Sequence, residues 1–234
     1  FRTDKGVRSK PKQIILLRMA ERWISHSTQR RMSVILALVL CVSAFRSTFL
    51  DWHHVPTQSM LPTIFPGDRI IVSKSWYRLR LPFSSLTVLN RHQPERSDIV
   101  TFLDPQDKLL MVKRIIGLPG DRVEMEDNQI IINGARASYN DRKDLKKQEI
   151  VDPKFSHLLE SNETFSGNSH RIAIYKIKPK WSQRSFEGVT IPASHYLVLG
   201  DNRDDSSDYR SFGLISAEQI LGKVILIDFQ PTKP

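Results

Sequence analysis

The order of hydrophobic and polar positions divides the chain into one long apolar segment and a series of short, alternating ones. Met32 to Phe45 is a run of fourteen residues without a charge, and continuing it to Leu50 gives nineteen residues. At about 1.5 Å per helical residue, nineteen residues span roughly 28 Å, close to the thickness of a bilayer's hydrocarbon core. We therefore expect a transmembrane anchor at 32–50. A cleaved secretory signal, with Val42-Ser43-Ala44 as its cleavage site, and a buried core helix are the alternatives.

After the anchor, the pattern changes to that of β-strands separated by turn residues. Strands are expected at 68–74, 97–102, 108–116, 122–125, 129–132, 171–178, 195–199 and 218–229. Asn133-Gly134 predicts a turn, while the polar stretches 75–96 and 136–170 predict loop or less regular structure. The fold class is therefore mainly β, preceded by one transmembrane helix.

The positive charge is concentrated at the N-terminal end. The net charge is +10, but residues 1–31 alone carry +7, which leaves +3 for everything after them. This distribution argues against a nucleic-acid partner and for a basic tail at a membrane surface, with an amphipathic helix at 13–25. The basic pair Arg30-Arg31 predicts a cytoplasmic N-terminus and a body on the outer side of the membrane.

One serine, Ser59, lies shortly after the anchor between Pro56 and Pro62. Proline fixes φ and removes a backbone donor, so we expect residues 55–63 to be extended and stiff. A serine held on such a segment is a candidate nucleophile, although most serines between prolines are simply loop residues. His53-His54 is a possible partner, but adjacent residues of an extended chain point to opposite sides.

The strand expected at 108–116 contains a lysine among apolar neighbours. Lys113 shares one face with Leu109, Met111 and Ile115. Burial disfavours the charged form of lysine, so its pKa is expected to fall from about 10.4 toward 8, where it can act as a base. Arg114 cannot take that role because guanidinium stays protonated, which leaves it as an ion-pair partner. Two basic side chains reaching out to water are the alternative interpretation.

Acidic and basic residues alternate densely in residues 200–213, between two apolar strands. We expect this loop to be held by ion pairs and by side-chain hydrogen bonds to the backbone. A calcium loop is an alternative, but the EF-hand spacing is missing and two arginines lie among the carboxylates. Neither the histidines nor the single cysteine, Cys41, has a zinc-binding spacing.

Three motifs together make the chain resemble the bacterial type I signal peptidases (leader peptidases), a family of Ser-Lys serine endopeptidases. They are Ser59-Met60-Leu61-Pro62-Thr63 with Gly67-Asp68, Lys113 to Asp121, and Gly200-Asp201-Asn202-Arg203 through Arg210. They occur in the family's order behind an anchor. The resemblance covers about residues 32–229 and is weak over 136–185. It implies an antiparallel β catalytic body with a smaller, variable β-rich insertion.

The resemblance also implies the roles of individual residues and the partners. Ser59 is similar to the nucleophile and Lys113 to the general base of an enzyme that cleaves signal peptides through an acyl-enzyme. No cofactor or metal is implied. Exported preproteins with Ala-x-Ala-type sites are the implied substrates, and membrane lipid is a further partner. The other implied positions are Thr57 with the Ser59 N–H (oxyanion hole), Ser206 (orienting the base), Arg114, Asp201, Asp208 and Arg210 (supporting shell), and Val55, Pro56, Met111 and Val112 (substrate pocket).

The chain departs from the family's usual pattern at five positions: Thr57, His53, Gln58, Asp205 and Tyr209. We expect the enzyme in the bacterial plasma (inner) membrane, with its catalytic part on the periplasmic side. The expected domains are a basic tail (1–31), the anchor (32–50), a catalytic domain in two parts (51–135 and 189–234) and the insertion (136–188). A self-cleaving Ser-Lys regulator and a non-catalytic membrane-tethered β module remain as alternative functions.

Overall fold

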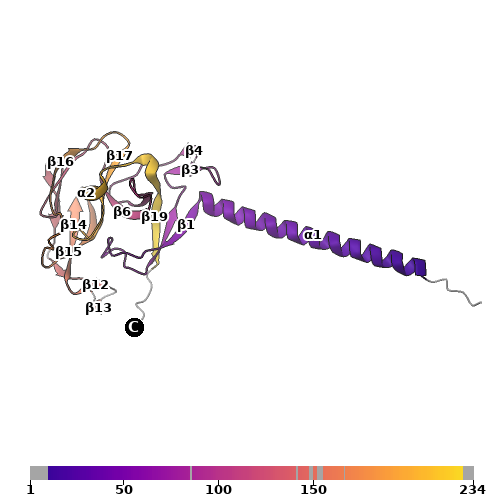
Figure 1. Cartoon of the computed structure of the whole chain (residues 1–234). Coiled ribbons are helices and arrows are strands. Elements are labelled where there is room, and N and C mark those ends of the chain that lie inside the picture. Colours follow the sequence, from indigo (N-terminus) through magenta and orange to yellow (C-terminus); the bar gives the residue numbers. More distant parts are fainter. Residues whose placement is uncertain are drawn as a thin grey trace, which may run out of the picture. The chain divides into compact units, whose positions relative to one another are not determined.

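A seven-stranded antiparallel sheet forms the centre of the body, which runs from Thr48 to the C-terminal end (Figure 1). The computed structural model describes residues 10–228 apart from 85, 141, 148–149, 152–154 and 166. The strand order is β1-β2-β19-β5-β6-β17-β18. These strands are β1 (Leu50–His54), β2 (Arg69–Ser73), β5 (Ile99–Leu103), β6 (Leu110–Gly117), β17 (His195–Leu199), β18 (Ile215–Ser216) and β19 (Ile220–Asp228).

Smaller sheets complete the body. The sheet β16-β7-β8-β9 and a sheet in which β10, β11 and β15 each pair with β14 are the larger of these; β3–β4 and β12–β13 are two-stranded. Their bounds are β3 (Arg78–Arg80), β4 (Thr87–Asn90), β7 (Arg122–Glu126), β8 (Gln129–Ile132), β9 (Ala135–Arg136), β10 (Ser138–Tyr139), β11 (Lys143–Asp144), β12 (Lys146–Lys147), β13 (Ile150–Val151), β14 (Leu158–Phe165), β15 (Asn168–Tyr175) and β16 (Phe186–Thr190). Two short helices, α2 (Tyr209–Phe212) and a 3-10 turn (Ala217–Gln219), lie near the end of the chain.

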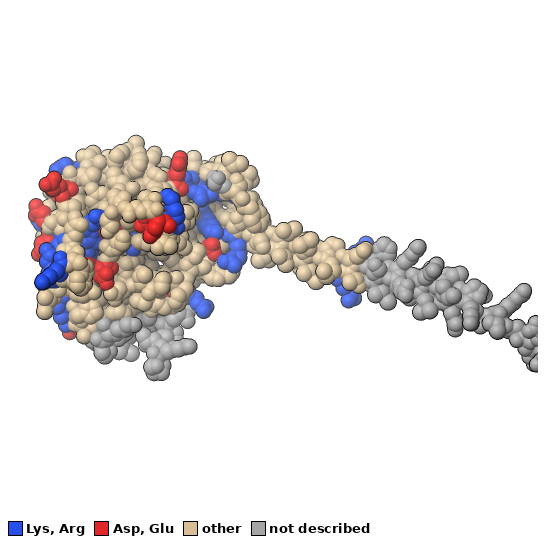
Figure 2. All heavy atoms as spheres, viewed as in Figure 1, with Lys and Arg blue, Asp and Glu red and all other residues tan. Residues whose placement is uncertain are grey.

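The expected mainly β fold behind an apolar helix is confirmed. Helix α1 (Lys10–Thr48) is continuous, and its segment Thr28–Thr48 is long and apolar enough to cross a membrane. Figure 2 shows a stretch of this helix without charged side chains, preceded by basic ones. The helix ends two residues before the expected end of the anchor, because Leu50 already pairs with Ser73 in the sheet. The residues of the basic tail before Lys10 lie outside the described part of the chain.

Several expected strands are confirmed with small shifts in their ends, among them β2, β5, β6, β7, β8, β17 and β19. The turn at Asn133-Gly134 has positive φ at both residues (52° and 81°), as a tight β-hairpin requires. Two expectations of irregular structure are wrong. Residues 75–96 contain the hairpin β3–β4, and residues 136–170 contain all of β14 and the first part of β15.

Candidate active site

Ser59 lies in a turn, not in extended chain. The Leu61 N–H donates to the Gln58 carbonyl at 3.1 Å and so closes a turn around Ser59. Met60 and Leu61 are both buried, but they belong to two different hydrophobic clusters. Burial of each side chain stabilises the fold by about 2–3 kcal/mol, enough to decide the local conformation. The expected extended conformation of residues 55–63 is therefore wrong from Ser59 onward.

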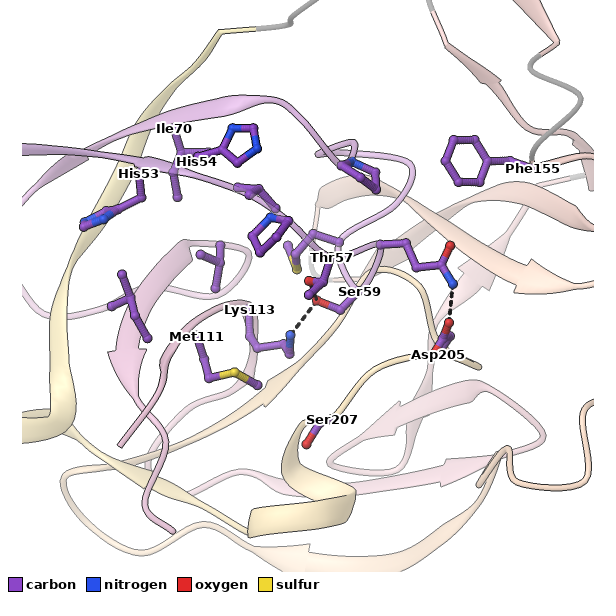
Figure 3. A pocket seen from close by; sticks show the side chains of 17 residues that line it. His53, His54, Thr57, Ser59, Ile70, Met111, Lys113, Phe155, Asp205 and Ser207 are labelled. Carbon is purple, nitrogen blue, oxygen red and sulfur yellow. Dashed lines mark hydrogen bonds between the residues drawn. The ribbon is translucent and has the colours of Figure 1, made fainter. Parts of the chain in front are cut away.

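Lys113 of β6 points at Ser59. The two atoms Lys113 Nζ and Ser59 Oγ are 2.7 Å apart, within hydrogen-bonding distance (Figure 3). Only 2% of Lys113 is exposed, and burial lowers its pKa to about 8, although Asp208 and Asp201 act to raise it. The base predicted from an apolar strand face thus has the geometry and the pKa to exchange a proton with the serine near neutral pH.

Thr57 lies beside the same hydroxyl. Its Oγ1 is 3.4 Å from Ser59 Oγ, and both residues line the same pocket. In the part of the chain that the structure describes, the Ser59 N–H has no hydrogen-bond acceptor. Thr57 and Ser59 therefore offer a hydroxyl donor and a backbone donor close to Ser59 Oγ.

The loop 200–213 meets the Ser59 turn through two contacts that the sequence did not single out. The Asn202 N–H donates to the Ser59 carbonyl at 3.1 Å, and Asn202 Nδ2 donates to the Gln58 carbonyl at 3.2 Å. A Cβ at Gly200 would lie 2.5 Å from the Ser59 carbonyl oxygen and 2.1 Å from Ser206 Oγ. Only glycine fits there, so the glycine that begins the Gly-Asp-Asn run of the third motif was the sequence signal for this close approach to the Ser59 turn.

The predicted supporting shell forms two Asp–Arg pairs. Arg114 donates to Asp201 through Nε at 2.8 Å and through NH2 at 2.7 Å. Arg210 binds both oxygens of Asp208 at 2.8 and 2.6 Å, and the Gly200 N–H donates to Asp208 at 3.0 Å. Burial alone would raise the pKa of Asp201, but Arg114 outweighs it and the net pKa lies below its usual value. These pairs fix the loop behind Lys113.

Ser206 lies beside Gly200 in the loop. Its Oγ is buried and, among the described residues, has no hydrogen-bond partner. A buried hydroxyl without a partner is rare in proteins and is often associated with function. The structure brings Ser206 into the loop next to the Ser59 turn but shows no hydrogen bond between Ser206 and Lys113.

A second group of ion pairs ties the loop to the region expected to be a variable insertion. Arg203 forms two hydrogen bonds with Glu163 of β14, and both side chains are wholly buried. Asp204 accepts two hydrogen bonds from Arg184. The loop also pairs with β15, since Ala173 exchanges backbone hydrogen bonds with Asp201 and Arg203. These partners are distant along the chain, so the local sequence pattern did not predict them.

The pocket above Ser59 has a volume of about 570 Å³. All four predicted pocket residues line it together with Ser59 and Lys113: Val55, Pro56, Met111 and Val112. Residues that the sequence did not assign to the pocket also line it: Met60, Pro66, Ile70, Leu110, Phe155 and Ser207. The pocket therefore combines apolar side chains with polar ones, among them Ser59, Lys113 and Ser207.

The positions that depart from the family pattern find partners here. Gln58 and Asp205 also line the pocket and are bonded to each other, Gln58 Nε2 donating to the Asp205 carboxylate. Tyr209 packs edge-on against Phe186, with ring centres 5.0 Å apart. His53 lies on β1 at the pocket, 3.8 Å from Asp51. Two of the departures thus contact each other.

Metal binding has little geometric support. Across the described residues, no group of three His, Cys, Asp or Glu side chains is arranged to hold an ion. Three of the four carboxylates considered for calcium are bonded to arginine: Asp201, Asp204 and Asp208.

The chain is similar to several known proteins. Residues 28–229 match the signal peptidase family, peptidase S26. The signal peptidase I of Buchnera aphidicola from Baizongia pistaciae is 30% identical over 227 residues, covering 81% of this chain and 73% of the relative. That of Rickettsia prowazekii is 30% identical over 218 residues, covering 88% and 82%. A crystal structure of a signal peptidase I from Enterococcus faecalis is 28% identical, covers 57% of this chain and 97% of its own, and gives a TM-score of 0.36.

The match over most of the chain defines the class: the protein belongs to the signal peptidase family, peptidase S26. It is a serine endopeptidase that cleaves signal peptides from the preproteins that carry them. This membership decides against the two alternative functions, the self-cleaving regulator and the non-catalytic module. The family is membrane-anchored, in agreement with the apolar N-terminal helix.

Proposed function

We propose that Ser59 is the nucleophile and Lys113 the general base of this endopeptidase. The observation that carries the proposal is the 2.7 Å contact between Ser59 Oγ and a lysine that is almost wholly buried. Neutral Lys113 takes the proton of Ser59 while Oγ attacks the scissile carbonyl carbon. The carbon–nitrogen bond then breaks, and the Lys113 ammonium gives its proton to the leaving amine. Lys113 next removes a proton from the water that hydrolyses the acyl-enzyme.

The negative charge on the carbonyl oxygen is stabilised by two donors, the Ser59 N–H and the Thr57 hydroxyl. Ser206 orients the base: its buried Oγ has no other partner in the described structure, so it is available to the Lys113 ammonium. Arg114, Asp201, Asp208 and Arg210 hold this arrangement without touching the substrate.

The substrate is bound as an extended strand between Val55–Thr57 and Met111–Val112. This part of the proposal is supported by the sheet register, because β17 pairs with Arg114, Ile115 and Gly117 and leaves the preceding residues of β6 without a partner on that edge in the described structure. Backbone pairing of this kind is a common way to hold a peptide. The shallow apolar lining at Val55, Pro56, Met111 and Val112 selects small side chains, as in Ala-x-Ala cleavage sites.

We further infer that α1 crosses the bacterial plasma membrane with its N-terminus in the cytoplasm. The basic residues before the apolar segment support this orientation. The catalytic domain then lies on the periplasmic side, where exported preproteins emerge. Membrane lipid is its second partner, and no nucleic acid is involved.

A preprotein processing assay in detergent micelles tests the proposal. Ser59→Ala is expected to reduce cleavage at an Ala-x-Ala site by at least about 10³-fold, because it removes the hydroxyl that the Lys113 amine contacts. The matched control is Ser84→Ala, an exposed serine of the β3–β4 hairpin outside the pocket, which is expected to cleave at the wild-type rate. Normal cleavage by a folded Ser59→Ala protein contradicts the proposal.

A further inference from the structure

Loop 200–213 contains four aspartates, and one of them differs from the rest. Three are each bonded to an arginine: Asp201 to Arg114, Asp204 to Arg184 and Asp208 to Arg210. Asp205 has no lysine or arginine within ion-pair distance among the residues that the structure describes. Its negative charge is therefore not cancelled by the loop's own cations.

Two neutral groups hold the Asp205 carboxylate in place. Gln58 Nε2 donates a hydrogen bond to Oδ2, and the Tyr175 hydroxyl donates to the same oxygen at 3.4 Å. Burial and then the nearby Asp205 carboxylate raise the pKa of Tyr175, so its hydroxyl remains a neutral donor. Such donors fix the position of a carboxylate and leave its charge available to a ligand.

The fixed carboxylate faces the substrate pocket. Asp205 is partly exposed and lines the pocket together with Ser59. Figure 3 shows Asp205 and Phe155 on one side of Ser59 and His53 and His54 on the other. In the proposed function, Val55 and Pro56, which follow His54 in the chain, contact the small side chains of the Ala-x-Ala site, the residues before the cut. The opposite side, toward Asp205, therefore receives the residues that follow the cleaved bond.

We propose that Asp205 determines specificity on the leaving-group side, favouring basic residues and rejecting acidic ones just after the cleavage site. The inference rests on the proposed function, which places the small side chains of the Ala-x-Ala site at Val55 and Pro56. A lysine side chain there is attracted to the carboxylate, whereas a glutamate is repelled by it and loses hydration without compensation. Asp205 does not take part in bond making or breaking.

The test uses the full chain in detergent micelles and preprotein-derived peptides with one Ala-x-Ala site. Three peptides carry Lys, Gln or Glu at both of the first two positions after the cut. The wild-type enzyme is expected to cleave the Lys peptide with a kcat/KM about ten-fold above that of the Glu peptide, as expected for one partly exposed charge interaction changing sign. Raising the ionic strength from about 0.05 to 0.5 M is expected to shrink this ratio, because salt screens partly exposed charges.

Asp205→Asn keeps the hydrogen-bond acceptor and removes the charge, so it is expected to bring the Lys-to-Glu ratio close to one. The matched control is Glu126→Gln, which removes one negative charge from the exposed end of the β7–β8 hairpin, outside the pocket, and is expected to keep the wild-type ratio. Equal kcat/KM values for the Lys and Glu peptides in the wild type overturn the inference, as does an unchanged ratio in Asp205→Asn. Ser59-dependent cleavage of the Gln peptide shows in either case that the proposed function stands; its absence means that the proposed function itself has failed.

Discussion

Lys113 on β6 and Arg203 in loop 200–213 are the two most completely buried cations in the described part of the body, and their surroundings differ. Arg203 is 0% exposed and forms two hydrogen bonds with the carboxylate of Glu163. Lys113 is 2% exposed, and its side chain forms a hydrogen bond with the neutral hydroxyl of Ser59. Burial lowers the pKa of Lys113 to about 8, whereas for Arg203 the attraction of Glu163 outweighs burial and the pKa rises.

The difference separates a cation that can release its proton near neutral pH, Lys113, from one that stays charged in an ion pair, Arg203. The carboxylates that act to raise the pKa of Lys113 are Asp208 and Asp201. Each is already bonded to an arginine, so neither compensates fully for the lysine's charge. A buried ammonium without a carboxylate partner destabilises the fold, but it gives up its proton near neutral pH. Arg203 remains charged and stabilises the contact between the loop and β14. Under the proposed function, the general base and the cation of the structural ion pair are thus different residues.

The largest effect is expected from Lys113→Met, which replaces the amine with an uncharged group of similar length. Cleavage should fall by about 10³–10⁴-fold because the base is lost. The free energy of unfolding at pH 7 should rise by about 1–3 kcal/mol, since the cost of burying the ammonium is removed. Preprotein processing and urea unfolding of the same preparation measure both quantities.

The double variant Ser59→Ala/Lys113→Met serves as the control. Because the two groups act as a unit, its activity should be no lower than that of either single variant. A loss of stability in Lys113→Met would contradict the interpretation of Lys113 as an uncompensated buried cation.

The opposite result is expected for Arg203→Met. Removal of this cation leaves Glu163 buried and charged without its arginine partner, at a cost of about 3–5 kcal/mol in the free energy of unfolding. Urea unfolding with circular dichroism measures the loss, and matched samples of Lys113→Met should move in the other direction.

The double change Arg203→Met/Glu163→Gln removes both charges and should recover much of that loss. If Arg203→Met alone is as stable as the wild type, the ion pair does not hold the loop to β14.

Lys113 was recognisable in the sequence because it is the charged residue on an otherwise apolar face of an alternating strand. The same kind of argument failed for β14. Its buried positions include Ser161 and Glu163, so the pattern reads as polar surface. What makes Glu163 a core residue is Arg203, forty residues away along the chain. The periodicity of a short segment does not reveal a partner so far away in the sequence.

The turn at Ser59 was mispredicted for a related reason. Pro56 and Pro62 favour extended chain locally, but burial of Met60 and Leu61 in separate clusters decides the conformation. Gln58 and Asp205 were each recognised as unusual, yet their hydrogen bond spans 147 positions and became visible only in the fold. The candidate base and nucleophile were therefore predictable, while most of the contacts that position them were not.

The smallest expected effect is the pH dependence that follows from the pKa of Lys113, lowered from 10.5 to about 8. Below pH 8 most Lys113 is protonated, so kcat/KM for an uncharged substrate should rise about ten-fold from pH 7 to a plateau above pH 8.

Stability should follow the same group: between pH 8 and 10.5 the unfolded chain still holds the proton that the folded chain has released. The free energy of unfolding should therefore increase over this window, by about 1–2 kcal/mol between pH 8 and 9.5. Comparing urea unfolding of the wild type and Lys113→Met at both pH values isolates this contribution, because the variant lacks the titrating group. An equal pH dependence in the two proteins would mean that Lys113 keeps an ordinary pKa and that the contrast with Arg203 does not hold.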